Sequence, residues 1–491
     1  MRAGFASPLL FVAAAGLLAA CPDRSISEVN PTQGRVEAKD IPIKVNRDLD
    51  LLFLVDNSPS MNDKQLNLVA NFATFITVLS GIPGGLPNVH IGVATSDLGA
   101  KGADDAAPGT TIGRSGSGGC SGTGDGGRLQ LLGGVTTTDG LPFLSDIQPD
   151  DPAVPRQRNY TGSLNDAFTA IAHVGAGGCG FEQHLEAVKQ ALSQANTADG
   201  APNAQFLRKD AFLAVIIIAD EDDCSMAHST LIADNATATA TLGPLQSFRC
   251  TRFGVLCDQG GADTDAMNVV GDKSLCHSND NSAYLTKAAA YADFLKGLKD
   301  DPNKVIVAGI IGTTSPFTVE TRPPSTGQPA VPALKHSCKY TGGDGKDEVA
   351  DPPIRIKTFL DQFPNRNTFA TICQQDLSGG LQQIAELLKA SIGDPCIEGK
   401  LASPPKYDCS VSAVVNPGAT NAMETVLPRC DDTSSNAPCW HILTDAAQCP
   451  AMDSDHLVLK VEGQDKLATD THIIANCVTL VTDASSDAGS P

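Results

Sequence analysis

The fold is decided by one stretch of the sequence, Leu49-Asp50-Leu51-Leu52-Phe53-Leu54-Val55, which is followed directly by Asp56-Asn57-Ser58-Pro59-Ser60. The first part is an apolar run of strand length, of the kind that is buried on both faces of a parallel sheet. The second part is a polar turn. Beyond it, apolar residues recur at helical spacing: Leu66, Val69, Phe72, Phe75, Ile76 and Leu79. The stretch therefore predicts a strand, a loop and a helix in succession.

The same order of elements recurs along the chain. Further strands are predicted at 89–95, 213–219, 305–311 and 368–372, with amphipathic helices between them. Apolar strands that alternate with such helices predict an α/β, Rossmann-like fold with a doubly wound, mostly parallel sheet. Ligands of such sheets bind at the carboxyl ends of the strands.

Composition divides the rest of the chain. The α/β domain is expected to end with the last helix, which is closed by Gly393 and Pro395. Beyond it, dense Cys and short alternating segments predict a small disulfide-stapled β-rich domain over 396–482, and a disordered tail over 483–491. Three Cys-rich insertions interrupt the α/β domain, and the sequence of the middle one is too irregular to predict a helix or a sheet. They are expected near 100–160, 224–280 and 313–367.

The N-terminus predicts export. Residues 1–20 are typical of a signal peptide, because Arg2 precedes an apolar run that is too short to span a bilayer. The run ends in Leu18-Ala19-Ala20-Cys21, which resembles the lipobox of bacterial lipoproteins, whose Cys is acylated. The alternative is an ordinary signal peptide that happens to contain a Cys. With acylation, residues 21–46 would be a tether to the cell envelope, at the outer membrane and facing the periplasm or the cell surface, and the lipid would be the only membrane anchor.

The remaining cysteines agree with export. The chain has 15 Cys, so that an even set remains beside Cys21. An even set in an exported chain predicts disulfides, and the spacing fits no zinc template. The candidates are Cys120, Cys179, Cys224, Cys250, Cys257, Cys276, Cys338, Cys373, Cys396, Cys409, Cys430, Cys439, Cys449 and Cys477.

A formal net charge of −21 disfavours nucleic acid and anionic lipid surfaces as partners. The charge permits a bound cation or a basic partner, and the alternative is that it serves solubility alone. Four acidic residues in succession, Asp220-Glu221-Asp222-Asp223, follow the strand at 213–219. Such a run repels itself unless a cation or a helix N-terminus relieves it, whereas the alternative is a solvated acidic loop.

Asp56, Ser58 and Ser60 place three hard oxygen donors in one turn, and Asp220 should reach the same edge of the sheet. Mg²⁺ prefers such oxygen ligands. The alternative is that Asp56 and Ser58 cap the first helix, which leaves Asp220 unexplained.

This arrangement resembles the metal-ion-dependent adhesion site of von Willebrand factor A domains, and the resemblance covers roughly 47–395. It implies that Asp56, Ser58, Ser60 and Asp220 hold Mg²⁺, or Ca²⁺ or Mn²⁺. The open position of the metal would then accept an acidic side chain of a protein ligand, with no bond broken.

The family also supplies a Thr from a loop before a helix, and here the chain departs from the pattern. The corresponding loop, Gly177-Gly178-Cys179-Gly180-Phe181-Glu182-Gln183, contains no Thr. Cys179 falls near the Thr position, and Glu182 is the nearest replacement oxygen donor. We therefore expect weak metal affinity with retained water ligands. Cys179 and Cys224 are both expected near this site, where disulfides would stiffen it, and their pairing with each other is one option.

The expected function is binding or adhesion by a membrane-tethered module, not enzymatic catalysis. The sequence has no Gly-x-Ser-x-Gly elbow and no His-Glu-x-x-His motif, and its nine His are scattered, with only His184 and His228 near the site. The first alternative is a metal-free structural domain of an envelope assembly whose Cys-rich loops make the contacts. A more remote alternative is a hydrolase built from the insertions.

Replacement of Cys21 by Ser should release the protein from membranes or block its processing, because the acyl chains need the thiol. Membrane fractionation and the mass of the mature N-terminus measure this. Ser27→Ala is the control and should leave attachment unchanged. An unmodified mature N-terminus at another residue would rule out the lipid anchor.

Overall fold

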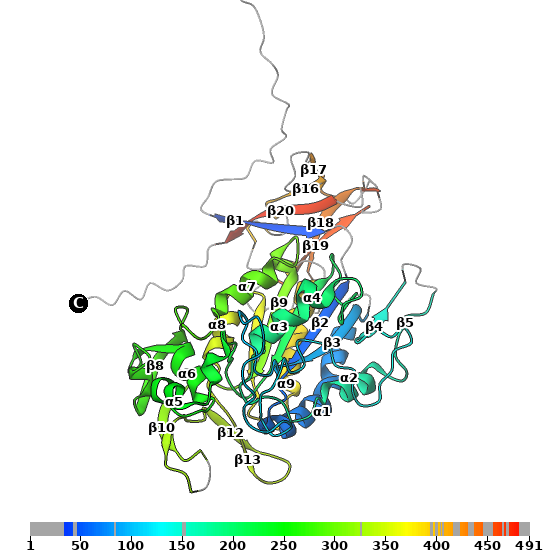
Figure 1. The fold of residues 1–491 in the computed structure, drawn as a ribbon. Helices are drawn as coiled ribbons and strands as arrows, with labels where there is room; N and C mark the ends of the chain where they lie inside the picture. Colours follow the sequence, from blue (N-terminus) through cyan, green and yellow to red (C-terminus); the bar gives the residue numbers. More distant parts are fainter. Residues whose placement is uncertain are drawn as a thin grey trace, which may run out of the picture. The chain divides into compact units, whose positions relative to one another are not determined.

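The computed structural model divides the chain into two compact units, one formed by Lys44–Pro395 and the other by Met1–Ile43 with Cys396–Pro491 (Figure 1). Each unit is described by itself. The described residues are 34–42, 47–82, 85–149, 154–324, 327–392, 396–397, 401–402, 404, 407–415, 423–430, 437–444, 455–463, 466–467 and 471–480. The predicted signal peptide, Cys21 and the predicted tail lie outside them.

A mixed sheet of seven strands forms the centre of the larger unit, in the order β14-β9-β6-β2-β3-β4-β5. Each strand predicted from the sequence is present. The strands β14, β9, β6, β2 and β3 are parallel, whereas β4 and β5 add an antiparallel edge. The strands are β2 Asp48–Val55, β3 Asn88–Thr95, β4 Leu144–Ile147, β5 Gln157–Arg158, β6 Phe212–Ile218, β9 Val305–Ile311 and β14 Asn367–Thr371.

Helices cover both faces of this sheet (Figure 1). Because side chains of a strand alternate between faces, Phe53 and Val55 of β2 pack into one core and Leu52 and Leu54 into the other. The first core includes α1 Asn62–Ser80, α2 Leu164–Ala172 and α9 Ser378–Ile392. The second includes α3 His184–Leu192, α7 Ala288–Lys296 and α8 Ile354–Leu360, and the short α4 Gln194–Thr197 follows α3.

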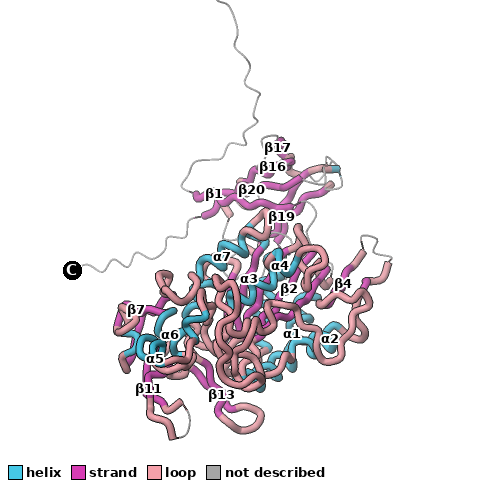
Figure 2. Tube along the Cα trace, in the orientation of Figure 1, coloured by secondary structure: helices cyan, strands magenta, loops and turns pink. Residues whose placement is uncertain are grey.

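The insertions contain more regular structure than their sequences indicate. The connection between β3 and β4 is mostly loop (Figure 2). The prediction that 224–280 is too irregular for a helix or a sheet is wrong. This segment holds α5 Ala236–Leu242, α6 Phe248–Gly254, β7 Val255–Gln259 and β8 Gly271–Ser278. In the third insertion, β10 Phe317–Arg322 and β11 Val331–Leu334 extend the same sheet in the order β11-β10-β8-β7, and β12 Cys338–Thr341 pairs with β13 Asp347–Ala350.

These short elements are stabilised by contacts other than a long apolar face. Their sequences therefore show no extended apolar periodicity. The Cys224–Cys250 and Cys257–Cys276 disulfides tie the segment together. The buried guanidinium of Arg249 also donates hydrogen bonds to backbone carbonyl groups, those of Leu231, Ala233, Gly243 and Pro244. Neither kind of contact leaves a hydrophobic pattern in the sequence.

The smaller unit is built from antiparallel sheets, with orders β1-β20-β16-β17 and β15-β19-β18. The assignment of 21–46 to a tether is wrong for β1, because Gly34–Pro42 pairs along its length with β20. Its Pro and Gly suggested a linker, but Arg35-Val36-Glu37-Ala38-Lys39 alternates as a strand does. The other strands are β15 Cys396–Ile397, β16 Cys409–Val415, β17 Met423–Val426, β18 Cys439–Thr444, β19 Leu457–Glu462 and β20 Thr471–Leu480.

Six disulfides join described cysteines, which is the pattern of an exported protein. Cys179 pairs with Cys120 and Cys224 with Cys250, so the two cysteines near the predicted site are not bonded to each other. Cys449 lies outside the described residues, as does the side chain of Cys396. The remaining pairs are Cys257–Cys276, Cys338–Cys373, Cys409–Cys477 and Cys430–Cys439. None of the described helices combines the length and the apolarity that a membrane crossing needs.

Phe72→Ala should lower the free energy of unfolding by about 3–5 kcal/mol, because it opens a cavity in the core between α1 and the sheet. The Phe72 ring stacks on Phe168 at a centroid distance of 3.4 Å and lies edge-on to Phe53 at 5.8 Å. Urea denaturation measures the loss. Thr77→Ala, on the exposed side of the same helix, is the control, and equal losses in the two variants would contradict this packing.

Candidate functional site

The predicted site residues meet at the carboxyl edge of the central sheet. β2 and β6 are parallel neighbours, with Val55 opposite Ile218. The pairing continues one residue further, where the backbone N–H of Asp56 donates to the carbonyl of Ile218 at 2.9 Å. Asp56 and Asp220 therefore leave the sheet side by side, as the sequence predicts.

A chain of hydrogen-bonded oxygen atoms links the two strand ends. Ser58 Oγ and Ser60 Oγ lie 3.0 Å apart, and Ser60 Oγ donates to Asp220 Oδ1 at 3.1 Å. Asp56 Oδ1 accepts the backbone N–H of Ser58 at 2.8 Å, which closes the turn. Asp56, Ser58 and Asp220 are buried, whereas Ser60 is exposed. The predicted set thus forms one cluster that opens to solvent at Ser60.

The alternative that Asp56 and Ser58 cap the first helix is wrong. A 3-10 turn, Pro59–Met61, separates them from α1, whose N-cap residue is Met61. No side-chain hydrogen bond caps either element. The oxygens of Asp56 and Ser58 therefore serve the turn and the cluster rather than the helix.

Two cationic groups that the site prediction did not include hold the carboxylates in place. Lys64 Nζ lies 3.1 Å from Asp220 Oδ2 and 2.9 Å from Glu348 Oε2. His184 Nε2 lies 3.3 Å from Asp56 Oδ2. Lys64 comes one helical turn after Ser60, a spacing that could have indicated it. His184 begins α3 directly after the loop at 177–183.

Burial and neighbouring charges oppose each other at both cations. Burial lowers the pKa of Lys64, but Asp220 and Glu348 outweigh it, so the net pKa is raised. Burial also lowers the pKa of His184, and its hydrogen bond and charge interaction with Asp56 again raise it overall. Both groups therefore favour their cationic forms beside the cluster.

The loop at 177–183 packs against the turn through its backbone. The N–H of Gly178 donates to the carbonyl of Asn57 at 2.8 Å. A side chain at Gly178 would place Cβ 2.1 Å from Asn57 Oδ1, so a larger residue there would have to displace the Asn57 side chain. Cys179, near the family's Thr position, is bonded to Cys120 and offers no hydroxyl. Glu182 is buried nearby with 2% of its surface exposed.

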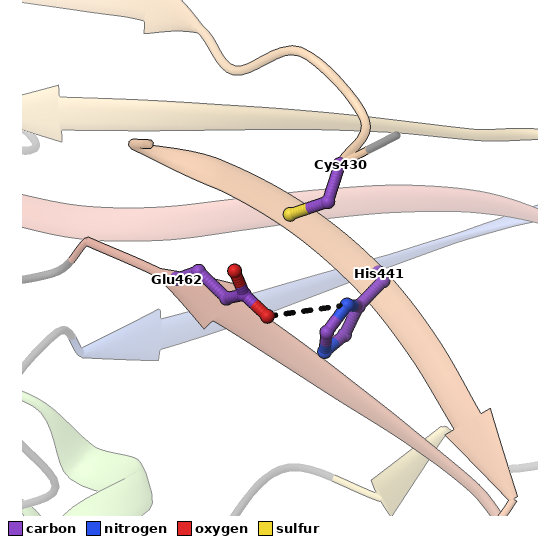
Figure 3. Close-up of side chains that lie close together, drawn as sticks. All are labelled: Cys430, His441 and Glu462. Atoms are coloured by element: carbon purple, nitrogen blue, oxygen red, sulfur yellow. Dashed lines mark ion pairs between the residues drawn. The ribbon is translucent and has the colours of Figure 1, made fainter. Parts of the chain in front are cut away.

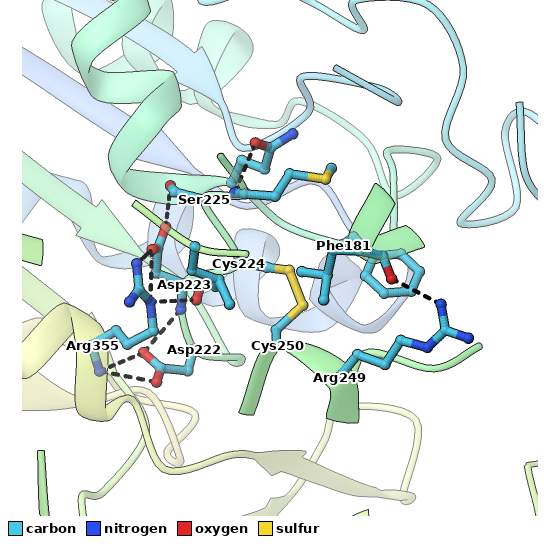
Figure 4. The surroundings of a disulfide bond; sticks show 12 residues. Phe181, Asp222, Asp223, Cys224, Ser225, Arg249, Cys250 and Arg355 are labelled. Atoms are coloured by element: carbon cyan, nitrogen blue, oxygen red, sulfur yellow. Dashed lines mark hydrogen bonds and ion pairs between the residues drawn. A yellow bond between two sulfur atoms is a disulfide. The ribbon is translucent and has the colours of Figure 1, made fainter. Parts of the chain in front are cut away.

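The four acidic residues at 220–223 differ in their partners. Asp222 accepts the backbone N–H groups of Arg355 and Ile356 at the start of α8. Asp223 pairs with the Arg355 guanidinium at 2.9 Å, and both side chains are fully buried (Figure 4). A helix start and an arginine thus relieve part of the repulsion, and the alternative of a solvated acidic loop is wrong for Asp223.

The remaining acidic groups lie close together, and burial and mutual repulsion disfavour their charged forms. Burial, followed by the charge of Asp56, raises the pKa of Asp220 to about 6 despite Lys64. Burial, followed by the charge of Glu221, raises the pKa of Glu182. Burial, followed by the charges of Asp351 and Asp220, raises the pKa of Glu221. A cation at this edge would relieve all three groups.

The donor set fits a hard divalent cation. Carboxylate and hydroxyl oxygens are the ligands that Mg²⁺ and Ca²⁺ take in proteins. Among the described residues, two buried polar atoms beside the cluster have no hydrogen-bond partner, Asn57 Oδ1 and His184 Nδ1. Buried polar atoms are normally satisfied, so water or ligand is expected there. Asp56, Ser58, Ser60 and Asp220 would hold the ion.

A second cluster in the smaller unit does not fit a metal. Cys430, His441 and Glu462 bring their ligand atoms within 4.8 Å of one another (Figure 3). The sulfur of Cys430 is bonded to Cys439, so no thiolate is present to bind. His441 and Glu462 remain as a 3.7 Å ion pair.

Comparisons with known proteins add little to this geometry. No family model and no curated protein match the chain. Among solved structures, the chain is similar to the pilus adhesin RrgA from Streptococcus pneumoniae, with 12% identity and a TM-score of 0.25. The alignment covers 91% of this chain and 58% of the adhesin, and at that TM-score no conclusion is drawn from it.

Arg355→Met should lower the free energy of unfolding by about 3–5 kcal/mol, because it leaves the buried Asp223 carboxylate without its cation. Urea denaturation measures the loss. Lys357→Met, in the same helix, removes a cation from an exposed pair with Asp361 and should cost less than about 1 kcal/mol. Similar losses in both variants would show that the buried pair does not stabilise this edge.

Proposed function

We propose that the protein is a binding module of the bacterial cell envelope that attaches to a protein ligand through a divalent cation. The observation that carries this proposal is the convergence of Asp56, Ser58, Ser60 and Asp220 in one cluster at the sheet edge. The two carboxylates come from strands that are far apart in sequence, and a purely local turn would not require Asp220.

We further propose that the larger unit is a von Willebrand factor A-like domain with a doubly wound sheet. The support is the central position of β2, from which the sheet extends through β3 to one edge and through β6 to the other. Helices on both faces add to this support. The antiparallel β4 and β5 belong to one edge only and leave the site edge parallel.

In this proposal each residue has a separate task. Exposed Ser60 marks the opening through which a ligand arrives, and Ser58 extends the row of oxygen donors inward. Lys64 and His184 contact the Oδ2 atoms of Asp220 and Asp56. These contacts fix the two carboxylates, so that each Oδ1 atom keeps one orientation. A bound Mg²⁺ would supply a positive centre that can share a carboxylate of the partner. Recognition of this kind requires no catalytic base.

The location is part of the proposal. The disulfides support export, and an acylated Cys21 would join the protein to the outer membrane. The strand β1 begins at Gly34, so a tether would be restricted to the residues between Cys21 and that strand. The protein would then be attached through its smaller unit.

A second candidate function, a metal-free scaffold, is favoured by two features of the site. The ammonium of Lys64 lies 3.1 Å from Asp220 and already compensates one carboxylate. Cys179, which is bonded to Cys120, also lacks the hydroxyl that a Thr provides at this position in von Willebrand factor A domains. Both features would weaken a metal site, and they distinguish this edge from the family pattern.

Millimolar Mg²⁺, Mn²⁺ or Ca²⁺ should raise the melting temperature of the protein, by an amount set by its concentration over Kd; at 100 times Kd the stabilisation is about 2.7 kcal/mol. Asp56→Ala should abolish the rise, and because it also removes the carboxylate beside buried His184, circular dichroism checks that this variant folds. Asp199→Ala, which removes an exposed acid, is the control. Absence of binding by calorimetry at millimolar concentrations would reject the metal site and favour the scaffold.

Glu182→Gln should weaken divalent binding further, about tenfold for the loss of one charged ligand, if Glu182 replaces the missing Thr. The same calorimetric titration measures the change in Kd. Glu386→Gln, in α9, is the matched control because its side chain is 43% exposed. Unchanged affinity in the Glu182 variant would remove Glu182 from the metal site and leave the other four residues in place.

A further inference from the structure

A cavity of about 530 Å³ lies beside the proposed metal site. The acidic residues Glu182, Glu221, Asp222 and Asp351 line it, together with Arg322 and His336. The insertions supply the opposite wall, through the segment around α6 and the hairpin β10–β11. The volume is that of a typical small-ligand pocket, and much larger than a single ion needs.

Most charged groups of this cavity already have partners. Arg322 Nη1 donates to His336 Nε2 at 2.5 Å, and His336 Nδ1 donates to Asp351 at 2.6 Å. Since a guanidinium only donates, Nε2 is the acceptor in this arrangement, and His336 links Arg322 to Asp351. The positive and the negative charge at its two ends offset each other. Asp222 is occupied by the backbone N–H groups at the start of α8.

Two carboxylates of the cavity have no ion-pair partner in the part of the chain that the structure describes, although the charge of Arg322 acts favourably on Glu221. Among the described residues, no ion pair reaches Glu182 or Glu221, and the hydrogen bond to the Glu182 carboxylate comes from its own backbone N–H. Glu182 is 2% exposed, and its negative charge and that of Glu221, which lines the same cavity, repel each other. A buried carboxylate without a partner is costly unless a ligand supplies one.

The walls of the cavity are suited to an aliphatic chain. Leu245, Phe248, Ala333 and Leu334 line it, and Pro323 and Pro324 are exposed, so they stand at its rim. Lysine and arginine side chains combine an apolar stem with a cationic end. Such a side chain would place its stem between these residues and its charge against the two free carboxylates.

We propose that this cavity binds the basic side chain, lysine or arginine, of a protein ligand, with Glu182 and Glu221 as the anionic partners. The proposal deepens the proposed function, because it assigns the chemistry of a second contact made by the same partner beside the metal. The ligand motif would then present a basic side chain close to an acidic one. The basic contact itself requires no metal.

The test uses the full mature protein and two probes, Nα-acetyl-lysine methylamide and its neutral counterpart Nα-acetyl-norleucine methylamide. Calorimetry or saturation-transfer NMR in the presence of a chelator should show the lysine probe bound with Kd on the order of millimolar, and the neutral probe at least about tenfold weaker. An arginine probe is a third arm and should behave like lysine.

Variants test whether the cavity carboxylates hold the probe. Glu221→Gln should weaken lysine-probe binding about tenfold, whereas Glu386→Gln, in α9, should leave it unchanged. Equal binding of both probes, or no effect of Glu221→Gln, would overturn the inference.

The two proposals fail separately. If divalent ions do not bind but the lysine probe does, the cavity stands and the metal-based function falls. If the ions stabilise the protein and the probe does not bind, the opposite holds. Circular dichroism of Glu221→Gln confirms that a lost signal is not lost folding, and Glu182→Gln then repeats the probe measurement on the second carboxylate.

Discussion

The parallel pairing of β2 with β6 is the contact on which the rest of the structure depends. Both strands are buried on both faces, so their register is fixed by two separate cores. A slip of one residue would exchange the two sets of side chains. That register places Asp56 beside the end of β6, and the turn at 56–60 and the acidic residues at 220–223 continue from these two strand ends.

The site edge gathers more negative charge than the fold needs. Of the four acidic residues at 220–223, Asp222 and Asp223 serve the start of α8 and Arg355, and Asp220 is held by Lys64. These contacts explain why the loop is ordered. Among the described residues they give no ion pair to Glu221 or to the nearby Glu182, although the charge of Arg322 acts favourably on Glu221.

Much of the fold and the centre of the site could be predicted from the sequence, because both follow from patterns along the chain. Apolar runs gave the strands, and the rule that parallel strands end at one edge brought Asp220 to Asp56. His184 and Lys64 could not be placed, since their roles depend on distances between elements. The elements of the disulfide-bonded insertion and the pairing of β1 with β20 could not be predicted for the same reason. Each is stabilised by a partner remote in sequence.

The separation between the two halves of the cluster also constrains how the protein is made. Ser60 and Asp220 are 160 residues apart in sequence. A chain that crosses a membrane N-terminus first delivers β2 well before β6, so one hydrogen-bonding edge of this apolar strand waits for a partner while β3 already covers the other. Unpaired edges of this kind attract other chains. Correct pairing of β2 therefore depends on how quickly residues 212–218 follow it. The order of synthesis thus affects how the candidate site forms.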